Sequence, residues 1–126
     1  MKINASFYIA VYQDGKRFPT ISINDPKYQM LGNLSQGHLS ESRGVIDEIN
    51  NIQKVVNGEL ASYSFGGDDW CIINVEKGKS SIISGFDSFE PIEVPTRDIL
   101  ELLERWSGFL VAYESGMIPG LNLGVK

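Results

Sequence analysis

The residues best suited to chemistry lie close together in residues 64–71, SFGGDDWC. Asp68 and Asp69 carry oxygen ligands of the kind that bind Mg²⁺ or Ca²⁺. Adjacent residues of a strand point to opposite faces, however, so a single ion rarely uses both. No calcium-binding loop with a terminal glutamate follows. The two preceding glycines favour a tight turn between strands, so we predict a hairpin here and no metal site.

Nucleophilic catalysis would have to use the single cysteine and the single histidine, Cys71 and His38. Cys71 begins the apolar run CIINV, which predicts a buried, unreactive thiol. One histidine cannot form a histidine-rich zinc site, and no Gly-x-Ser-x-Gly or Walker motif occurs. We therefore expect a protein that is not an enzyme and has no cofactor. The 16 acidic residues leave one alternative open, a small metal- or carboxylate-dependent enzyme that uses Asp68 or Asp69.

The charge of the chain is concentrated in its second half. The net charge is −5, and residues 59–114 alone carry 11 acidic and 4 basic side chains. Such a region repels nucleic acid and anionic lipid and attracts a basic protein. The 11 basic residues are scattered and form no stripe interleaved with aromatic residues, so we expect no nucleic-acid or membrane partner. A simpler interpretation is that the acidic residues only keep the chain soluble.

The first third of the chain is predicted to contain a hairpin, a loop and a helix. Apolar residues alternate over residues 3–12, which predicts a half-buried strand. Asp14 and Gly15 predict a turn into a second strand that begins at Pro19. Residues 24–39 are rich in glycine, amide and hydroxyl residues and are predicted to be a loop. A helix is predicted over residues 40–57, with Ser40 as N-cap and this apolar stripe: Val45, Ile46, Ile49, Ile52 and Val56.

Tightly linked apolar runs follow and predict antiparallel pairing. The predicted strands are residues 60–65, 70–75, 80–86 with Gly85 as a possible bulge, and 90–94. A second amphipathic helix is predicted to begin at Thr96 as its cap and to end before Gly116. Its apolar stripe is Ile99, Leu102, Leu103, Trp106, Phe109, Leu110 and Tyr113. The sequence therefore predicts one α+β domain over residues 1–126, a mostly antiparallel sheet with two amphipathic helices packed on it.

Composition and the ends of the chain favour the cytoplasm. No run of about 18 apolar residues occurs, and the first residues lack the pattern of a secretory signal. A single cysteine excludes an intramolecular disulfide. The apolar residues 117–125 are expected to lie on the body of the protein or to serve as a self-association strip, and the oligomeric state is left open.

Residues 90–110, EPIEVPTRDILELLERWSGFL, resemble the closing segment of small bacterial immunity proteins. These proteins neutralise the toxin domains of contact-dependent inhibition and related polymorphic toxin systems. The residues that carry the resemblance are Leu102, Leu103, Trp106, Phe109 and Leu110. The resemblance implies a binding protein that inhibits a cognate toxin, and many toxins of these systems are basic nucleases. It carries over no contact residue, because toxin contacts vary across the family.

The acidic second half gives the resemblance a physical basis, because a basic toxin would be steered to it and held by it. We expect the partner surface to comprise Asp68, Asp69, Trp70, Glu76, Asp87, Glu90 and Glu93. Besides the enzyme, the remaining alternative is a structural or self-associating cytoplasmic protein.

Overall fold

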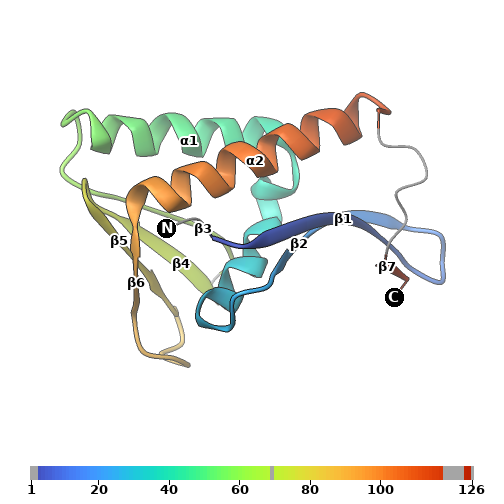
Figure 1. The fold of residues 1–126 in the computed structure, drawn as a ribbon, viewed down its shortest axis with the longest axis horizontal. Helices are drawn as coiled ribbons and strands as arrows, with labels where there is room; N and C mark the ends of the chain where they lie inside the picture. Colours follow the sequence, from blue (N-terminus) through green and yellow to red (C-terminus); the bar gives the residue numbers. More distant parts are fainter. Residues whose placement is uncertain (1–2, 69, 118–123, 126) are drawn as a thin grey trace.

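The computed structural model describes residues 3–68, 70–117 and 124–125 (Figure 1). Its element order confirms the α+β class that the sequence predicts. The strands are β1 (Ala5–Val11), β2 (Arg17–Ile23), β3 (Tyr63–Asp68), β4 (Cys71–Val75), β5 (Lys79–Ile83), β6 (Ile92–Pro95) and β7 (Gly124–Val125). The helices are the 3₁₀ helices η1 (Pro26–Ser35) and η2 (Gly37–Ser40) and the α-helices α1 (Ser42–Val56) and α2 (Thr96–Glu114).

The strands form two sheets, whereas the sequence predicts one. The four-stranded sheet has the order β3-β4-β5-β6 and is antiparallel throughout. The other sheet has the order β2-β1-β7, with β1 and β2 antiparallel and β7 parallel to β1. Pro19 lies inside β2, opposite Ile9, and does not begin the strand as predicted. It is tolerated because β2 is at the edge of its sheet, where a missing N–H breaks no ladder.

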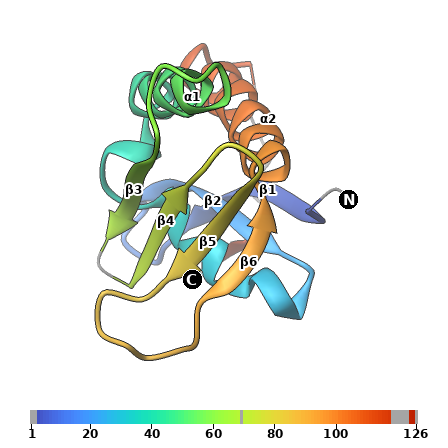
Figure 2. The same ribbon diagram turned by 90° about the vertical axis from the view of Figure 1, so that its left-hand side faces the viewer.

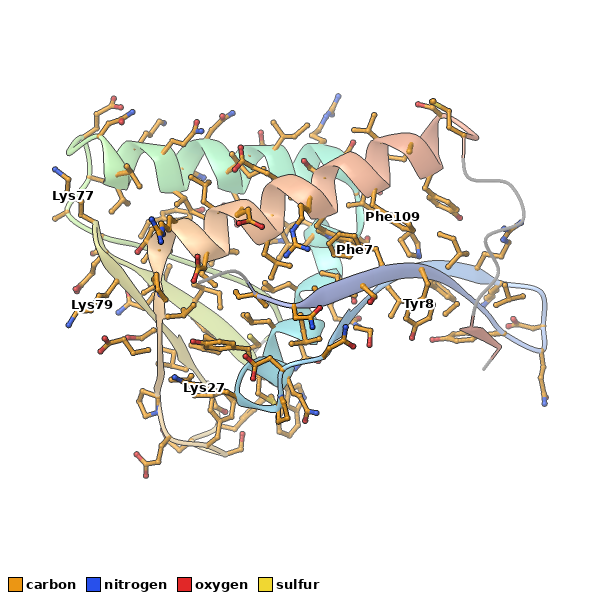
Figure 3. The ribbon with its side chains drawn as sticks, in the orientation of Figure 1. Phe7, Tyr8, Lys27, Lys77, Lys79 and Phe109 are labelled. Carbon is orange, nitrogen blue, oxygen red and sulfur yellow. The ribbon has the colours of Figure 1, made fainter. Side chains whose placement is uncertain are left out.

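The two α-helices form one layer that covers both sheets (Figures 1 and 2). Trp106 of α2 is fully buried in the shared core, as predicted, and its indole Nε1–H donates to the carbonyl of Leu39 at 2.8 Å. Phe7 of β1 and Phe109 of α2 point toward each other beside it, with ring centroids 5.7 Å apart (Figure 3). This aromatic group joins the helix layer to the three-stranded sheet.

The predicted loop at residues 24–39 is wrong, because this segment forms η1 and η2. Its leucines at 31, 34 and 39 are fully buried. A segment that buries such side chains must also pair its backbone groups, and short 3₁₀ turns do so locally. Asp25 starts η1 by accepting a hydrogen bond from the backbone N–H of Lys27 at 3.0 Å.

Both predicted helix caps are wrong. Ser40 is the last residue of η2, and its hydroxyl donates to the carbonyl of Gly37. The N-terminus of α1 is instead capped from the far end of α2, because the Glu114 carboxylate accepts bonds from the Ser42 N–H at 2.9 Å and the Ser42 hydroxyl at 2.6 Å. Thr96 is the first residue of α2 and donates its hydroxyl to the carbonyl of Glu76. These side chains link separate elements, so local spacing could not assign them.

The predicted stripe of α1 is rotated in the structure. Ile46 was expected in the core but is 43% exposed, whereas Glu48 is only 6% exposed. Gly85 is not a bulge, since β5 ends at Ile83; the irregular register lies in β3, between Gly66 and Asp68. In the tail, Met117 is 74% exposed, β7 pairs with β1, and residues 118–123 lie outside the described residues.

Candidate protein-interaction site

The end of the four-stranded sheet that lies farthest from the helices carries an exposed aromatic pair. The β3–β4 turn and the loop of residues 84–91 meet there because the strands are antiparallel (Figure 2). Trp70 and Phe86 have ring centroids 4.9 Å apart at an interplanar angle of 57°. They are 52% and 56% exposed. We call these two residues, together with Asp87 and Glu90, the sheet tip.

A buried serine fixes the loop that carries Phe86. The Ser84 hydroxyl accepts the backbone N–H groups of Phe86 at 3.1 Å and Ser88 at 3.2 Å. It also shares a hydrogen bond of 2.7 Å with the Ser88 hydroxyl. Between them Asp87 adopts a positive φ of 53°, a conformation that aspartate tolerates better than most residues. The loop is therefore ordered around Ser84, which reduces the entropy that binding through Phe86 would cost.

Three of the predicted contact residues lie together at the tip. Trp70, Asp87 and Glu90 are all exposed. Asp68 ends β3 and pairs with Cys71 across the turn, but its side chain is not described. Asp69 lies outside the described residues. The alternative of an enzyme that uses Asp68 or Asp69 therefore stays a prediction.

Two predicted contact residues do not belong to the tip. Glu76 lies in the β4–β5 turn at the opposite end of the sheet, next to Lys77 and Lys79 (Figure 3). Glu93 lies on β6, and its carboxylate is 3.7 Å from Nζ of Lys79. Successive turns of an antiparallel meander lie at alternate ends of the sheet, so acidic residues in successive turns are divided between the two ends.

Phe86 is the contact candidate that sequence analysis missed. It lies in a loop, where neither the helical nor the strand period applies. The usable signal was the pattern Ser84-Gly-Phe-Asp-Ser88, in which serine hydroxyls bind nearby backbone groups and hold a bulky residue outward.

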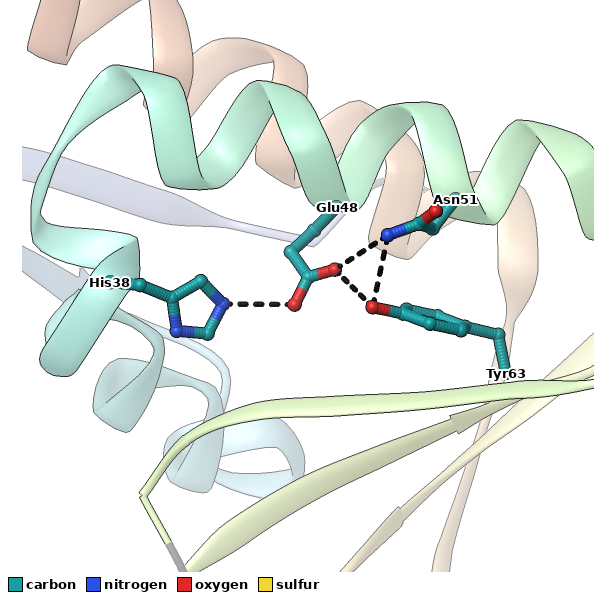
Figure 4. A network of polar contacts seen from close by, with 4 residues as sticks. All are labelled: His38, Glu48, Asn51 and Tyr63. Atoms are coloured by element: carbon teal, nitrogen blue, oxygen red, sulfur yellow. Dashed lines mark hydrogen bonds and ion pairs between the residues drawn. The ribbon is translucent and has the colours of Figure 1, made fainter.

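A second polar cluster joins η2, α1 and β3 (Figure 4). The buried Glu48 carboxylate lies 2.9 Å from Nε2 of His38 through one oxygen. Its other oxygen accepts the Tyr63 hydroxyl at 2.5 Å and the Asn51 amide at 3.2 Å. Asn51 also donates to the Tyr63 hydroxyl at 3.0 Å. Burial and the bond to Glu48 raise the pKa of Tyr63 to about 12, because the phenolate would lie against a carboxylate.

This cluster has the groups needed to hold a proton but also a clear structural role. The His38 side chain is 50% exposed and rests on a carboxylate that is 8% exposed. Such a carboxylate orients an imidazole, as it does in catalytic dyads. Of the partners described for Glu48, His38 comes from η2 and Tyr63 from β3, whereas Asn51 lies in α1 with Glu48 itself. We interpret the cluster as a hydrogen-bond network that stabilises the packing of η2, α1 and β3 against one another.

The described residues form no metal-binding cluster, and the cavity near the start of α2 does not select one charge sign. In the described ranges, no three His, Cys, Asp or Glu residues are grouped so that they could hold a metal ion. Cys71 is buried, as predicted. A cavity of about 410 Å³ lies near the start of α2, but two lysines and two acids line it, so it selects neither charge sign: Lys27, Tyr28, Gly78, Lys79, Glu93, Pro95 and Asp98.

Comparison with protein-family models, curated proteins and solved structures gives no match for this chain. The resemblance of residues 90–110 to immunity proteins therefore stays a prediction from the sequence pattern. Among the described helices, none has both the length and the apolar content to cross a bilayer.

Proposed function

We propose that this protein is an immunity protein that binds a basic toxin domain, for example a nuclease, and blocks it in the cytoplasm of the producing cell. The observation that carries the proposal is the exposed Trp70–Phe86 pair beside the exposed acids Asp87 and Glu90. An inhibitor of this kind needs a firm contact surface and no chemistry of its own. The sheet tip supplies such a surface.

A few residues supply most of the binding free energy in protein interfaces. Tryptophan is enriched at the few positions that dominate affinity, and aromatic residues as a class are enriched at interfaces. Two large neighbouring rings that are more than half exposed are unfavourably hydrated. Covering them with a partner removes that cost. The ordered Ser84 loop adds to the gain, since little conformational freedom remains to be lost.

The charges at the tip favour a basic partner. Residues 80–96 contain no lysine or arginine, and within the described structure neither Asp87 nor Glu90 forms an ion pair. Glu93, in contrast, is already paired with Lys79. Unpaired surface acids raise the association rate of a cationic protein and strengthen the complex where they are desolvated.

The test is to look for a secreted toxin gene beside the gene of this protein and to co-express the two. We expect the wild-type protein to restore growth and to co-purify with the toxin domain. The double reversal Asp87→Arg and Glu90→Arg should abolish rescue. If the wild-type protein does not restore growth, the proposed function is contradicted. If the double reversal restores growth fully, the sheet tip is not the contact surface.

Glu76 provides a matched control for the charge reversal. Its carboxylate is exposed like those of the tip but lies at the other end of the sheet. Glu76→Arg, combined with Glu59→Arg to equal the charge change, should leave rescue intact. If this control abolishes rescue as well, net charge and not the sheet tip governs binding.

A further inference from the structure

We infer that the group of the partner that binds the sheet tip is an arginine side chain in preference to a lysine. This inference rests on the proposed function, since it names the chemistry that the same surface recognises. It follows from two exposed rings that lie in contact and from two exposed carboxylates in the loop that carries one of these rings.

The first requirement of a guanidinium site is an accessible ring face. The Trp70 and Phe86 rings are tilted by 57°, so they do not stack flat on each other, and each stays more than half exposed. Arginine is planar and weakly hydrated, and it stacks on aromatic faces more often than lysine does. The ammonium of lysine is compact and strongly hydrated, so it gains less from such a surface.

The second requirement is a carboxylate that is not already paired. Asp87 directly follows Phe86, and Glu90 lies in the same loop. Neither has an ion-pair partner in the described part of the chain. The planar fork of arginine can bind a carboxylate through two parallel hydrogen bonds while its flat face covers a ring.

A second aromatic pair in the same chain shows the contrast. Tyr12 and Phe18 in the β1–β2 hairpin have ring centroids 5.1 Å apart and are 41% and 44% exposed. Their neighbouring acid, Asp14, is already engaged, because it accepts the Lys16 N–H at 2.9 Å and lies 3.9 Å from Lys16 Nζ. This pair has similar rings without free carboxylates, so it is a built-in control.

The experiment is a titration of ¹⁵N-labelled protein with two short glycine-spaced peptides, one containing arginine and one containing lysine at the same positions. We expect the arginine peptide to shift the Trp70 indole signal and the amides of residues 84–90. It should bind about two- to five-fold more tightly than the lysine peptide, because only a guanidinium can stack on a ring and bind a carboxylate through two parallel hydrogen bonds. Phe86→Leu should remove this preference, and Phe18→Leu should preserve it. Equal affinities, or shifts centred on Phe18 or Glu76, would overturn the inference.

The outcomes separate the inference from the proposed function. Rescue from the toxin without an arginine preference overturns the inference alone. An arginine preference at the tip without rescue or toxin binding overturns the proposed function and leaves an arginine-binding surface whose partner is a different protein.

Discussion

Because the pKa of Tyr63 is raised, the free energy of unfolding should fall as the pH rises through the alkaline range. The Tyr63 pKa is raised from 10.0 to about 12, so the protonated hydroxyl stabilises the folded state fully below about pH 10. This contribution is lost as the pH rises through about 12, because the unfolded chain gives up the same proton earlier. We expect the free energy of unfolding in urea to fall between roughly pH 9 and pH 11.5 by more in the wild type than in Tyr63→Phe.

At neutral pH the same substitution should cost about 1.5–3 kcal/mol, the usual contribution of a hydrogen bond to a charged group. Tyr12→Phe is the control, since Tyr12 lies in an exposed hairpin and is 41% exposed. It should change stability by less than about 0.5 kcal/mol. If the free energy of unfolding has the same pH dependence in Tyr63→Phe and Tyr12→Phe, the bond between Tyr63 and Glu48 does not raise the pKa of Tyr63.

At the scale of elements, η2 and α1 approach so closely that only glycine fits at position 44. A Cβ built there would lie 1.8 Å from the carbonyl oxygen of His38 and 2.7 Å from its carbonyl carbon. Both are backbone atoms, so no side chain can move aside. We expect Gly44→Ala to lower the free energy of unfolding by more than about 2 kcal/mol, well above the average point substitution.

Gly108 in α2 is the matched control for Gly44. A Cβ there would meet nothing within 4 Å. Because alanine favours helices over glycine, Gly108→Ala should stabilise the protein by about 0.5–1 kcal/mol. Urea unfolding of both variants measures the difference, and similar effects of the two would contradict the close approach of η2 to α1.

Elements were predictable where a short-range period exists. The strand β1 and the helix α2 follow from residues two, three or four positions apart, such as Leu102 and Trp106, and β4 follows from a short apolar run. The 3₁₀ helices were missed because Leu31, Leu34 and Leu39 are buried by distant elements and not by a repeating pattern. The division into two sheets was missed for the same reason, since strand pairing is a contact between residues far apart in sequence.

The candidate site was only partly predictable, because its members come together from two turns. Trp70 and Asp87 were predicted as contact residues because they lie in loops or at strand ends beside the predicted hairpins. Their proximity depends on the register that sets Ile72 opposite Ile83, which the sequence does not specify. Glu93 was predicted for the same surface, but it lies on β6 with its carboxylate 3.7 Å from Lys79 Nζ, a contact that depends on strand pairing as well.

At the scale of the whole molecule, the core residues that stabilise the fold and the residues of the proposed binding surface lie in different places. The two α-helices bury Trp106 and the leucines of α2 against the sheets, whereas the sheet tip projects away from that core (Figure 1). Trp70→Leu and Phe86→Leu should therefore change the free energy of unfolding by less than about 0.5 kcal/mol each. Trp106→Leu should lower it by about 3 kcal/mol or more, because a cavity forms and the Leu39 carbonyl loses its donor.

The effects of these substitutions on partner affinity should be the reverse of their effects on stability, provided that each variant is measured while folded. The two tip variants should lose the partner while keeping wild-type circular dichroism and unfolding. Trp106→Leu, assayed at a temperature where it is still folded, should retain affinity, since Trp106 packs on Phe7 and Leu39 in the core and not on the tip residues. If the tip variants unfold as readily as Trp106→Leu, then Trp70 and Phe86 support the core, and a lost interaction would report folding instead of contact with a partner.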